Sequence, residues 1–271
     1  MAPQLKKGLQ PLLEMVEPRA VLLAIEVPTD SVLNIEGALI VKNFPGVWLK
    51  TQKLGFSAQE LTPQTFEDAA ENIYRAAATP LPADEVTVCG LSCTSMAFVL
   101  GPRRVDEQLR SACPNAKTTD MARAQIAAIH ALGVRRVALV TPYIPELADR
   151  NAEFIESSGI SVVSRMTMGL TRDALTSRVS KASIKDWAAA VDCGEAEAVV
   201  LGCSALRAAE PGFIDELEAE LGKPVVTSTQ AFIWWMLRSA GVHETIEGYG
   251  TLFSSHDIPG AALQLGATRT E

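Results

Sequence analysis

Two stretches of the sequence repeat one another and decide the fold: LSCTSMAFVLGPRRVDEQLRSACP at residues 91–114 and LGCSALRAAEPGFIDELEAELGKP at residues 201–224. In each stretch a cysteine, Cys93 or Cys203, follows a short apolar run and precedes a residue with a hydroxyl group. A proline nine residues after Cys93, and eight after Cys203, predicts the start of a helix. A second proline closes each unit 21 residues after its cysteine. The repeat therefore predicts two similar halves, each with a cysteine where a strand ends.

Apolar runs alternate with helical patterns along the rest of the chain. Runs rich in Val, Leu and Ile are typical of parallel strands that helices cover on both faces. We predict strands at residues 20–27, 86–91, 134–140, 161–164, 198–201 and 224–228. We predict helices at residues 64–77, 102–112, 120–132, 145–158, 183–192, 211–221 and 229–240. The expected fold class is α/β, with two similar parallel-sheet halves.

The repeat also predicts how the chain is divided and where a ligand binds. Residues 1–117 together with 229–271 are expected to form the first half, and residues 118–228 the second. Ligands of open parallel sheets bind at the carboxyl ends of the strands. Two halves that face each other would place the two thiols across one cleft, so we expect the active site between them.

Composition excludes several classes of protein. The 271 residues carry 32 acidic and 24 basic side chains, a net charge of −8, which disfavours a nucleic-acid-binding surface. No run approaches the roughly 18 consecutive apolar residues of a membrane helix, and the first residues lack the apolar core of a secretory leader. Five cysteines without regular spacing do not form a disulfide framework. We therefore expect a cytoplasmic protein with reduced thiols and no membrane partner.

The two repeated cysteines are the candidate catalytic residues. Backbone N–H groups and the helix dipole at a strand-to-helix turn favour a negative charge, so we expect both turns to favour the thiolates of Cys93 and Cys203. Thr94 and Ser204 follow the cysteines and can cap a turn or donate a hydrogen bond to an anion, and Ser95 adds a third hydroxyl. The remaining cysteines are expected to be packing residues: Cys89, Cys113 and Cys193.

Four other residues have open assignments. Tyr143 ends a predicted strand at the same sheet edge as the cysteines, and its hydroxyl either donates to an anionic intermediate or packs in a turn. Thr29 and Asp30 end the first strand, where Thr29 is a candidate carboxylate ligand and Asp30 either orients a donor or is structural. Arg207 pairs either with a substrate carboxylate or, the interpretation we favour, with the Glu-rich helix that follows it.

Motifs for metals and large cofactors are missing from the sequence. It contains no HxH, HExxH or CxxC spacing, and its three histidines form no ligand cluster. It contains neither GxxxxGK[ST] nor GxGxxG, and no GxSxG nucleophile elbow. The prediction is a site without metal or cofactor.

Four segments carry a family resemblance: GLSCTSMAF at 90–98, VALVTPYI at 137–144, LGCSALR at 201–207 and ELEAELGKPVVTSTQAFIWWMLRSAG at 216–241. They resemble the maleate cis–trans isomerase and arylmalonate decarboxylase branch of the Asp/Glu racemase superfamily. The resemblance implies two Rossmann-like halves related by pseudo-two-fold symmetry, with a site between them that needs neither metal nor cofactor.

The resemblance also assigns roles to individual residues. Arylmalonate decarboxylases have glycine where this chain has Cys93, whereas members with two cysteines are racemases or isomerases. Thr94, Ser95, Tyr143 and the backbone of Ser204 would form the cradle for a carboxylate or enediolate. The chain departs from maleate isomerases after the first strand. They typically carry an Asn-containing sequence there, and this chain has Thr-Asp-Ser at 29–31.

The leading functional prediction is a cofactor-independent isomerase with two cysteines on opposite faces of a small mono- or dicarboxylate, most like maleate cis–trans isomerase. The alternatives are an Asp/Glu-type racemase and an arylmalonate-decarboxylase-like enzyme of a catabolic pathway such as ectoine utilisation. A binding protein for small acids on the same scaffold is the alternative outside catalysis. Related enzymes are commonly dimers or larger, which leaves a homo-oligomer open.

Overall fold

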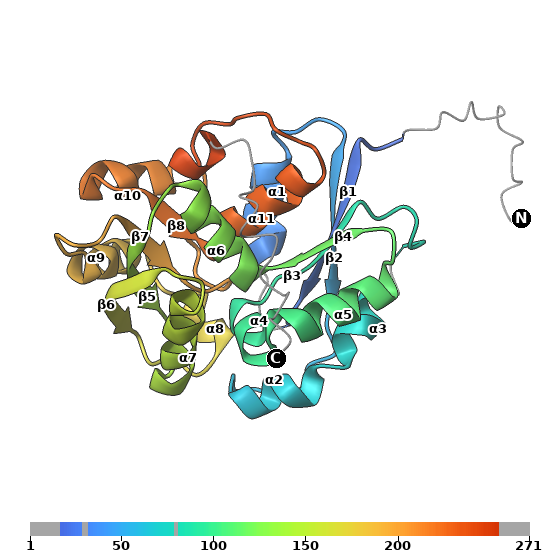
Figure 1. Ribbon diagram of the computed structural model, residues 1–271, viewed down its shortest axis with the longest axis horizontal. Helices are drawn as coiled ribbons and strands as arrows, with labels where there is room; N and C mark the ends of the chain where they lie inside the picture. The colour runs from blue at the N-terminus through green and yellow to red at the C-terminus, as the bar shows by residue number, and fades with distance from the viewer. Residues whose placement is uncertain (1–16, 29–31, 79–80, 255–271) are drawn as a thin grey trace, which may run out of the picture.

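Two four-stranded parallel sheets form the framework of the computed structural model, which describes residues 17–28, 32–78 and 81–254 (Figure 1). The first sheet contains β1 (Ala20–Glu26), β2 (Val47–Lys53), β3 (Val88–Leu91) and β4 (Lys117–Asp120). The second contains β5 (Arg136–Thr141), β6 (Ser161–Thr167), β7 (Ala198–Leu201) and β8 (Val225–Thr227). The strand orders, β2-β1-β3-β4 and β6-β5-β7-β8, are the same order twice. The predicted α/β fold with two similar parallel-sheet halves is confirmed.

Helices connect the strands and cover the sheets. In the first part of the chain they are α1 (Val32–Val41), α2 (Pro63–Ala69), α3 (Asn72–Ala77), α4 (Thr94–Leu100), α5 (Pro102–Ala112) and α6 (Met121–Ala131). In the second part they are α7 (Pro145–Glu156), α8 (Asp173–Thr176), α9 (Lys181–Val191), α10 (Phe213–Leu221), α11 (Ser228–Ser239) and the 3-10 turn η1 (Thr251–Ser254). The expected helix at 64–77 is divided into α2 and α3. The first of these, α2, begins with Pro63 in its first turn, behind a capping box from Thr62.

Strands β2 and β4 and helices α1, α4 and α8 were not predicted. β2 is an edge strand, and most of its residues after Val47 are partly exposed and polar. β4 has only four residues, of sequence KTTD. Neither shows the continuous apolar run of a central strand. Hydrogen bonding along the neighbouring strand, which a single segment does not encode, places them in the sheet.

Equivalent backbone hydrogen bonds place the two cysteines at matching points of the two sheets. The N–H of Ser92, just after β3, donates to the carbonyl of Ile25 in β1 at 2.8 Å. The N–H of Gly202, just after β7, donates to the carbonyl of Val140 in β5 at 2.9 Å. The next residue in each case is the repeated cysteine, so both cysteines lie at the carboxyl end of the third strand of their sheet.

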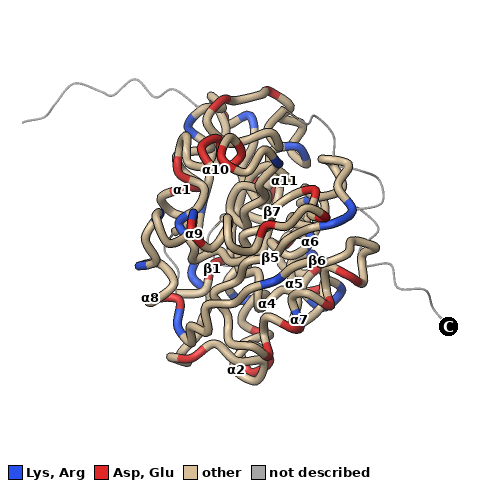
Figure 2. The backbone as a smooth tube through the Cα atoms, turned by 90° about the vertical axis from the view of Figure 1, so that its left-hand side faces the viewer, with Lys and Arg blue, Asp and Glu red and all other residues tan. Residues whose placement is uncertain are grey.

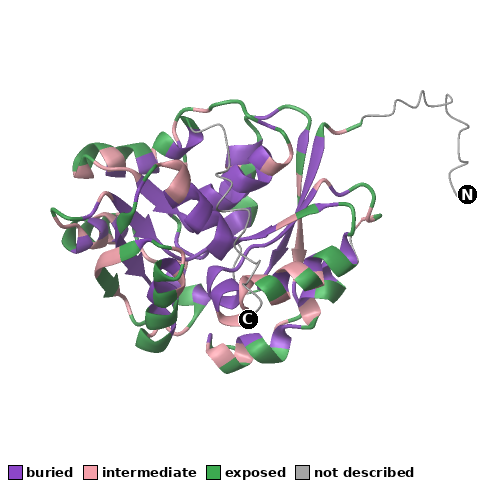
Figure 3. Ribbon diagram, in the orientation of Figure 1, coloured by how far each residue is buried: buried purple, intermediate pink, exposed green. Residues whose placement is uncertain are grey.

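Helices α6 and α11 pack against each other between the two sheets, at the centre of Figure 1. Helix α11 follows β8 of the second sheet but also contacts β3, β4 and α1 of the first. This approach requires Gly90 in β3, because a Cβ atom there would lie 2.7 Å from the ring of Phe232. Nearly all of α11 is buried, as the purple ribbon in Figure 3 shows. The division at residues 117 and 229 stays a prediction. β4 of the first sheet ends at Asp120, just beyond the first of these limits.

Among the described residues, a few charged side chains are buried, such as those of Glu36 in α1 and Asp120 at the end of β4, and the others are at least partly exposed. Figure 2 shows acidic and basic residues interspersed along the chain trace. Several form exposed pairs within one helix, such as Arg103 with Glu107 and Arg110 with Asp106. Among the described residues, none of the helices is both long and apolar enough to cross a membrane.

Candidate active site

Cys93 lies directly before helix α4, in an extended conformation with φ −133° and ψ 109°. It is the N-cap residue, the position next to the first-turn N–H groups that have no partner within a helix. Its Sγ lies 3.6 Å from the hydroxyl oxygen of Ser95. Helix α4 ends at Gly101, whose φ of 81° favours glycine, and Pro102 starts α5 as predicted. The expected strand-to-helix turn is present at Cys93.

Cys203 has a different continuation, which corrects the expectation that both cysteines precede a helix. After Cys203 the chain makes a turn and a loop, and α10 begins only at Phe213, behind the left-handed N-cap residue Gly212. One backbone group, the N–H of Ala205, donates to Sγ of Cys203 at 3.4 Å. Farther along the loop, the N–H of Ala209 donates to Oε1 of Glu36 in α1 at 3.0 Å. The amides of this loop are therefore satisfied individually, partly from the other half, instead of by a helix.

Tyr143 lies near both cysteines. It follows β5, is 2% exposed, and its ring packs edge-on against Phe98 of α4 with centroids 5.9 Å apart. Its hydroxyl has no oxygen or nitrogen partner in the described part of the chain. Burial raises the pKa of this hydroxyl well above its usual range, and the proximity of Cys203 and Cys93 raises it further. Tyr143 therefore stays a neutral hydrogen-bond donor near both thiols.

The Tyr143 loop is held to the strand beside it. The carbonyl of Tyr143 accepts from the N–H of Gly169 at 3.0 Å, and the carbonyl of Pro142 accepts from the N–H of Leu170 at 2.7 Å. Thr167 at the end of β6 also donates its hydroxyl to the carbonyl of Tyr143. The phenol is thus fixed by its backbone as well as by its packing on α4.

The other residues that the sequence singled out divide into four groups. Ser95 and Ser204 are buried next to Cys93 and Cys203, respectively. Thr94 is buried too, but its hydroxyl donates to Oγ of Ser228 at 2.9 Å. Arg207 lies about half exposed and pairs at 3.3 Å with Glu210, which lies in the loop before α10 and not in the Glu-rich helix that the favoured interpretation named. Two further candidates, Thr29 and Asp30, lie outside the described residues.

Sequence reasoning missed two buried polar residues near the cysteines. Ser228 is the first residue of α11, and Gln125 lies in the otherwise apolar face of α6. Nε2 of Gln125 donates to Oγ of Ser228 at 2.9 Å and to the carbonyl of Leu201 at 3.4 Å. The sequence did contain a signal for Gln125, which is the one amide side chain in the apolar pattern AQIAAIHA. An amide in a buried position requires hydrogen-bond partners, so its presence there indicates a buried polar contact.

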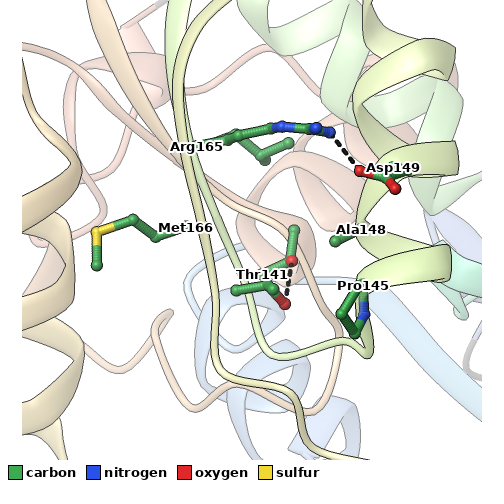
Figure 4. Close-up of a pocket in the computed structure, with 8 residues that line it drawn as sticks. Thr141, Pro145, Ala148, Asp149, Arg165 and Met166 are labelled. Carbon is green, nitrogen blue, oxygen red and sulfur yellow. Dashed lines mark hydrogen bonds and ion pairs between the residues drawn. The ribbon is translucent and has the colours of Figure 1, made fainter.

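Two further observations bear on ligands. Among the described residues, no group of three or more His, Cys, Asp or Glu side chains is arranged to hold a metal ion. A surface cavity of about 160 Å³ lies between β5, β6 and α7, apart from the cysteines (Figure 4). Arg165 and Asp149 form an ion pair of 2.7 Å at its rim, and neither Cys93 nor Cys203 lines it.

Comparisons with known proteins identify the enzymes that this chain is similar to. A family model described as arylmalonate decarboxylase matches residues 30–253. Arylmalonate decarboxylase from Bordetella bronchiseptica is 29% identical over 232 residues, which cover 83% of this chain and 93% of that protein. Maleate isomerase from Nocardia farcinica is 25% identical over 239 residues, which cover 85% of this chain and 94% of that protein.

Solved structures of both enzyme types share the fold. A double mutant of arylmalonate decarboxylase in its liganded form has a TM-score of 0.76 at 28% identity, over 86% of this chain and 98% of that one. A mutant of Nocardia farcinica maleate cis–trans isomerase with a covalently bound succinylcysteine intermediate has a TM-score of 0.80 at 19% identity, over 88% of this chain and 99% of that one. Because the family model spans most of its length, the chain belongs to the arylmalonate decarboxylase family.

Proposed function

We propose that this chain is an isomerase of small carboxylic acids that uses two cysteines and no cofactor, and that it converts maleate to fumarate. The observation that carries the proposal is the buried hydroxyl of Tyr143, whose electrostatic neighbours are the thiols of both Cys93 and Cys203. Two sulfur atoms around one hydrogen-bond donor suit a reaction in which two groups act on one small substrate. A protein that only binds acids has no need of two buried thiols at such a site.

In the proposed mechanism Cys93 is the nucleophile. Its thiolate adds to one carbon of the double bond, and the electron pair of the π bond moves into the neighbouring carboxylate to give an enediolate. The remaining single bond then rotates. Return of the electron pair breaks the C–S bond and releases the trans product with the thiolate restored. When the carbanion is protonated on the way, Cys203 supplies that proton and takes it back.

The enediolate requires hydrogen-bond donors that are in place before the reaction. The hydroxyls of Tyr143 and Ser95 and the N–H groups of the first turn of α4 are the donors at the Cys93 side. The backbone of Ser204 is the donor at the Cys203 side. The net charge of −8 makes such local donors necessary, because the overall field repels an anionic substrate. Thr29 remains a predicted carboxylate ligand.

The second candidate is decarboxylation or racemisation, favoured by the 29% identity to an arylmalonate decarboxylase. In a decarboxylase, Cys203 alone would deliver a proton to the enediolate left by loss of carbon dioxide. In a racemase, Cys93 would serve as the acid or base on the opposite face of the substrate. The variant Cys93→Gly distinguishes the isomerase hypothesis from the decarboxylase hypothesis. It should lose isomerase activity, and a decarboxylase-like site would then release carbon dioxide from an aryl malonate.

Proton NMR in D₂O against a panel of dicarboxylic and amino acids tests the proposal. Conversion of the vinylic signal of maleate to that of fumarate supports it. Deuterium at an α-carbon with no change of double-bond geometry would show that the chain is a racemase instead. Release of carbon dioxide from a malonate would show that it is a decarboxylase. Turnover of none of them refutes the isomerase. A cytoplasmic location and a homo-oligomeric state remain predictions, which fractionation and light scattering check.

A further inference from the structure

Three buried polar side chains connect the segments that carry the two cysteines. Thr94 is the first residue of α4 and directly follows Cys93, and Ser228 is the first residue of α11. Gln125 lies in α6. We call this group the Thr94–Ser228–Gln125 bridge. Its far end is the carbonyl of Leu201, the last residue of β7, two positions before Cys203.

The contacts form an unbroken path. Oγ1 of Thr94 donates to Oγ of Ser228 at 2.9 Å, and Nε2 of Gln125 donates to the same oxygen at 2.9 Å. Nε2 also donates to the carbonyl of Leu201 at 3.4 Å. The path therefore runs from the residue beside one thiol, through two helices packed between the sheets, to the strand end before the other thiol.

The three side chains of the bridge are buried, so the loss of any one of their hydrogen bonds is costly. Thr94, Ser228 and Gln125 are each at most 1% exposed, so water does not replace a lost partner. A hydroxyl oxygen has two acceptor sites, and Thr94 and Gln125 occupy those of Ser228. Removing the Ser228 hydroxyl would leave the buried Thr94 hydroxyl to Sδ of Met121 at 3.7 Å, a weak acceptor, and Nε2 of Gln125 to the carbonyl of Leu201 at 3.4 Å. A buried donor that exchanges a good acceptor for a weaker one loses stability. The bridge thus holds α4 and the end of β7 in one arrangement.

We propose that the Thr94–Ser228–Gln125 bridge is a positioning device that sets the two thiols relative to each other, and that the hydroxyl of Thr94 acts through Ser228 instead of through the substrate. The inference deepens the proposed function and rests on it for its kinetic consequence. The backbone N–H of Thr94 remains a donor in the first turn of α4. Only the role of its hydroxyl changes from the sequence-based expectation.

A double-mutant cycle tests this assignment. Thr94→Val and Ser228→Ala should each lower kcat by about 10- to 100-fold, the range that a small misplacement of reacting groups costs, with KM little changed. The double variant should be no slower than Ser228→Ala alone, because both changes break the same link. Thr94→Ser, which keeps the hydroxyl, should rescue the rate. If Thr94 binds substrate directly, the two losses multiply and KM rises in Thr94→Val.

A second readout does not depend on any substrate. The rates at which iodoacetamide alkylates Cys93 and Cys203, measured by peptide mass spectrometry, should change in Ser228→Ala and change no further in the double variant. The matched control is Thr119→Val, which removes an equally buried hydroxyl of β4 outside the bridge and should leave both rates and turnover as they are. Unchanged alkylation at both cysteines in Ser228→Ala overturns the bridge even if the isomerase is right. Altered alkylation without any maleate turnover supports the bridge and refutes the isomerase.

Discussion

Cys93 and Cys203 occupy the same place in two copies of one sheet, yet their surroundings differ. The bond from Ser92 to Ile25 is matched by the bond from Gly202 to Val140, so each cysteine leaves its sheet at the same point. Beyond that point the first chain segment coils directly into α4, whereas the second makes a loop before α10. Sheet topology thus sets where the sulfur atoms lie, and the following segment sets what each one contacts.

This difference suggests a division of labour. Cys93 is the N-cap residue of α4, a position where the helix dipole favours a thiolate. At Cys203 a single backbone N–H, that of Ala205, reaches the sulfur atom. We infer that Cys93 is the residue that adds to substrate and that Cys203 moves the proton.

Replacing each thiol gives the largest expected effects. Cys93→Ala should abolish isomerisation, because no covalent adduct can form. Cys203→Ala should lower kcat by about 10²–10⁴-fold, the usual contribution of a proton-transfer group. Initial rates with maleate measure both, and thermal unfolding by circular dichroism shows that the fold persists. The half-buried Cys193 provides the control, since Cys193→Ala should keep full activity. Full activity in either site variant would disprove the two-thiol mechanism.

Tyr143→Phe removes the buried hydroxyl near both cysteines and should have the next largest effect. Loss of one preorganised donor to an oxyanion typically lowers kcat by about 10²–10³-fold. The measurement is kcat and KM with the substrate found by NMR. A variant with unchanged kcat would show that the Tyr143 ring serves only to pack against Phe98.

The same residue makes a prediction about stability at high pH. Burial raises the pKa of Tyr143 above 10.0, so the folded state keeps its proton when the unfolded chain loses it. A raised pKa contributes stability in full below about pH 10, and that contribution is lost as the pH rises further. The wild-type free energy of unfolding should therefore fall more steeply above pH 10 than that of Tyr143→Phe. Urea unfolding at a series of pH values measures this difference. If the free energies of unfolding of wild type and Tyr143→Phe fall equally above pH 10, the burial of the hydroxyl is contradicted.

Glu36 offers a way to disturb one cysteine without the other. Its carboxylate accepts from the N–H of Ala209 at 3.0 Å and so holds the loop that follows Cys203. Glu36→Leu should cost about 1–3 kcal/mol of unfolding free energy, because a buried N–H loses its acceptor. It should also change alkylation at Cys203 more than at Cys93. Glu36→Gln, which keeps an acceptor, is the control, and equal changes at both thiols would refute the link.

The sequence predicted the positions of the central strands and of the two cysteines better than it predicted the surroundings of the cysteines. The central strands β1, β3, β5 and β7 are buried apolar runs, so the pattern alone finds them. The edge strand β2 and the short β4 are polar, and the neighbouring strand decides their structure. The repeat located both cysteines, since equal spacing reflects equal topology.

The surroundings of the cysteines were harder to predict. Two similar sequences, CTSMAF and CSALRA, become a helix and a loop. In the loop after Cys203, the N–H of Ala209 donates to the carboxylate of Glu36, which is distant in the sequence. The hydroxyl of Thr94 likewise finds Ser228, which is 134 positions away in the chain. Such partners come from the packing of the two halves, and no local pattern contains them.

Arg207 should give the smallest effect, although it is only four residues after Cys203. Its guanidinium is about half exposed and pairs with Glu210, which Lys181 also contacts. An exposed pair of this kind is worth about 0–1 kcal/mol, and the second cation preserves most of the charge balance at Glu210. Arg207→Ala should therefore leave kcat/KM within about twofold of the wild type and barely shift the urea midpoint. A large rise in KM would instead mean that Arg207 leaves Glu210 to bind the substrate carboxylate, and the loop after Cys203 would then move on binding.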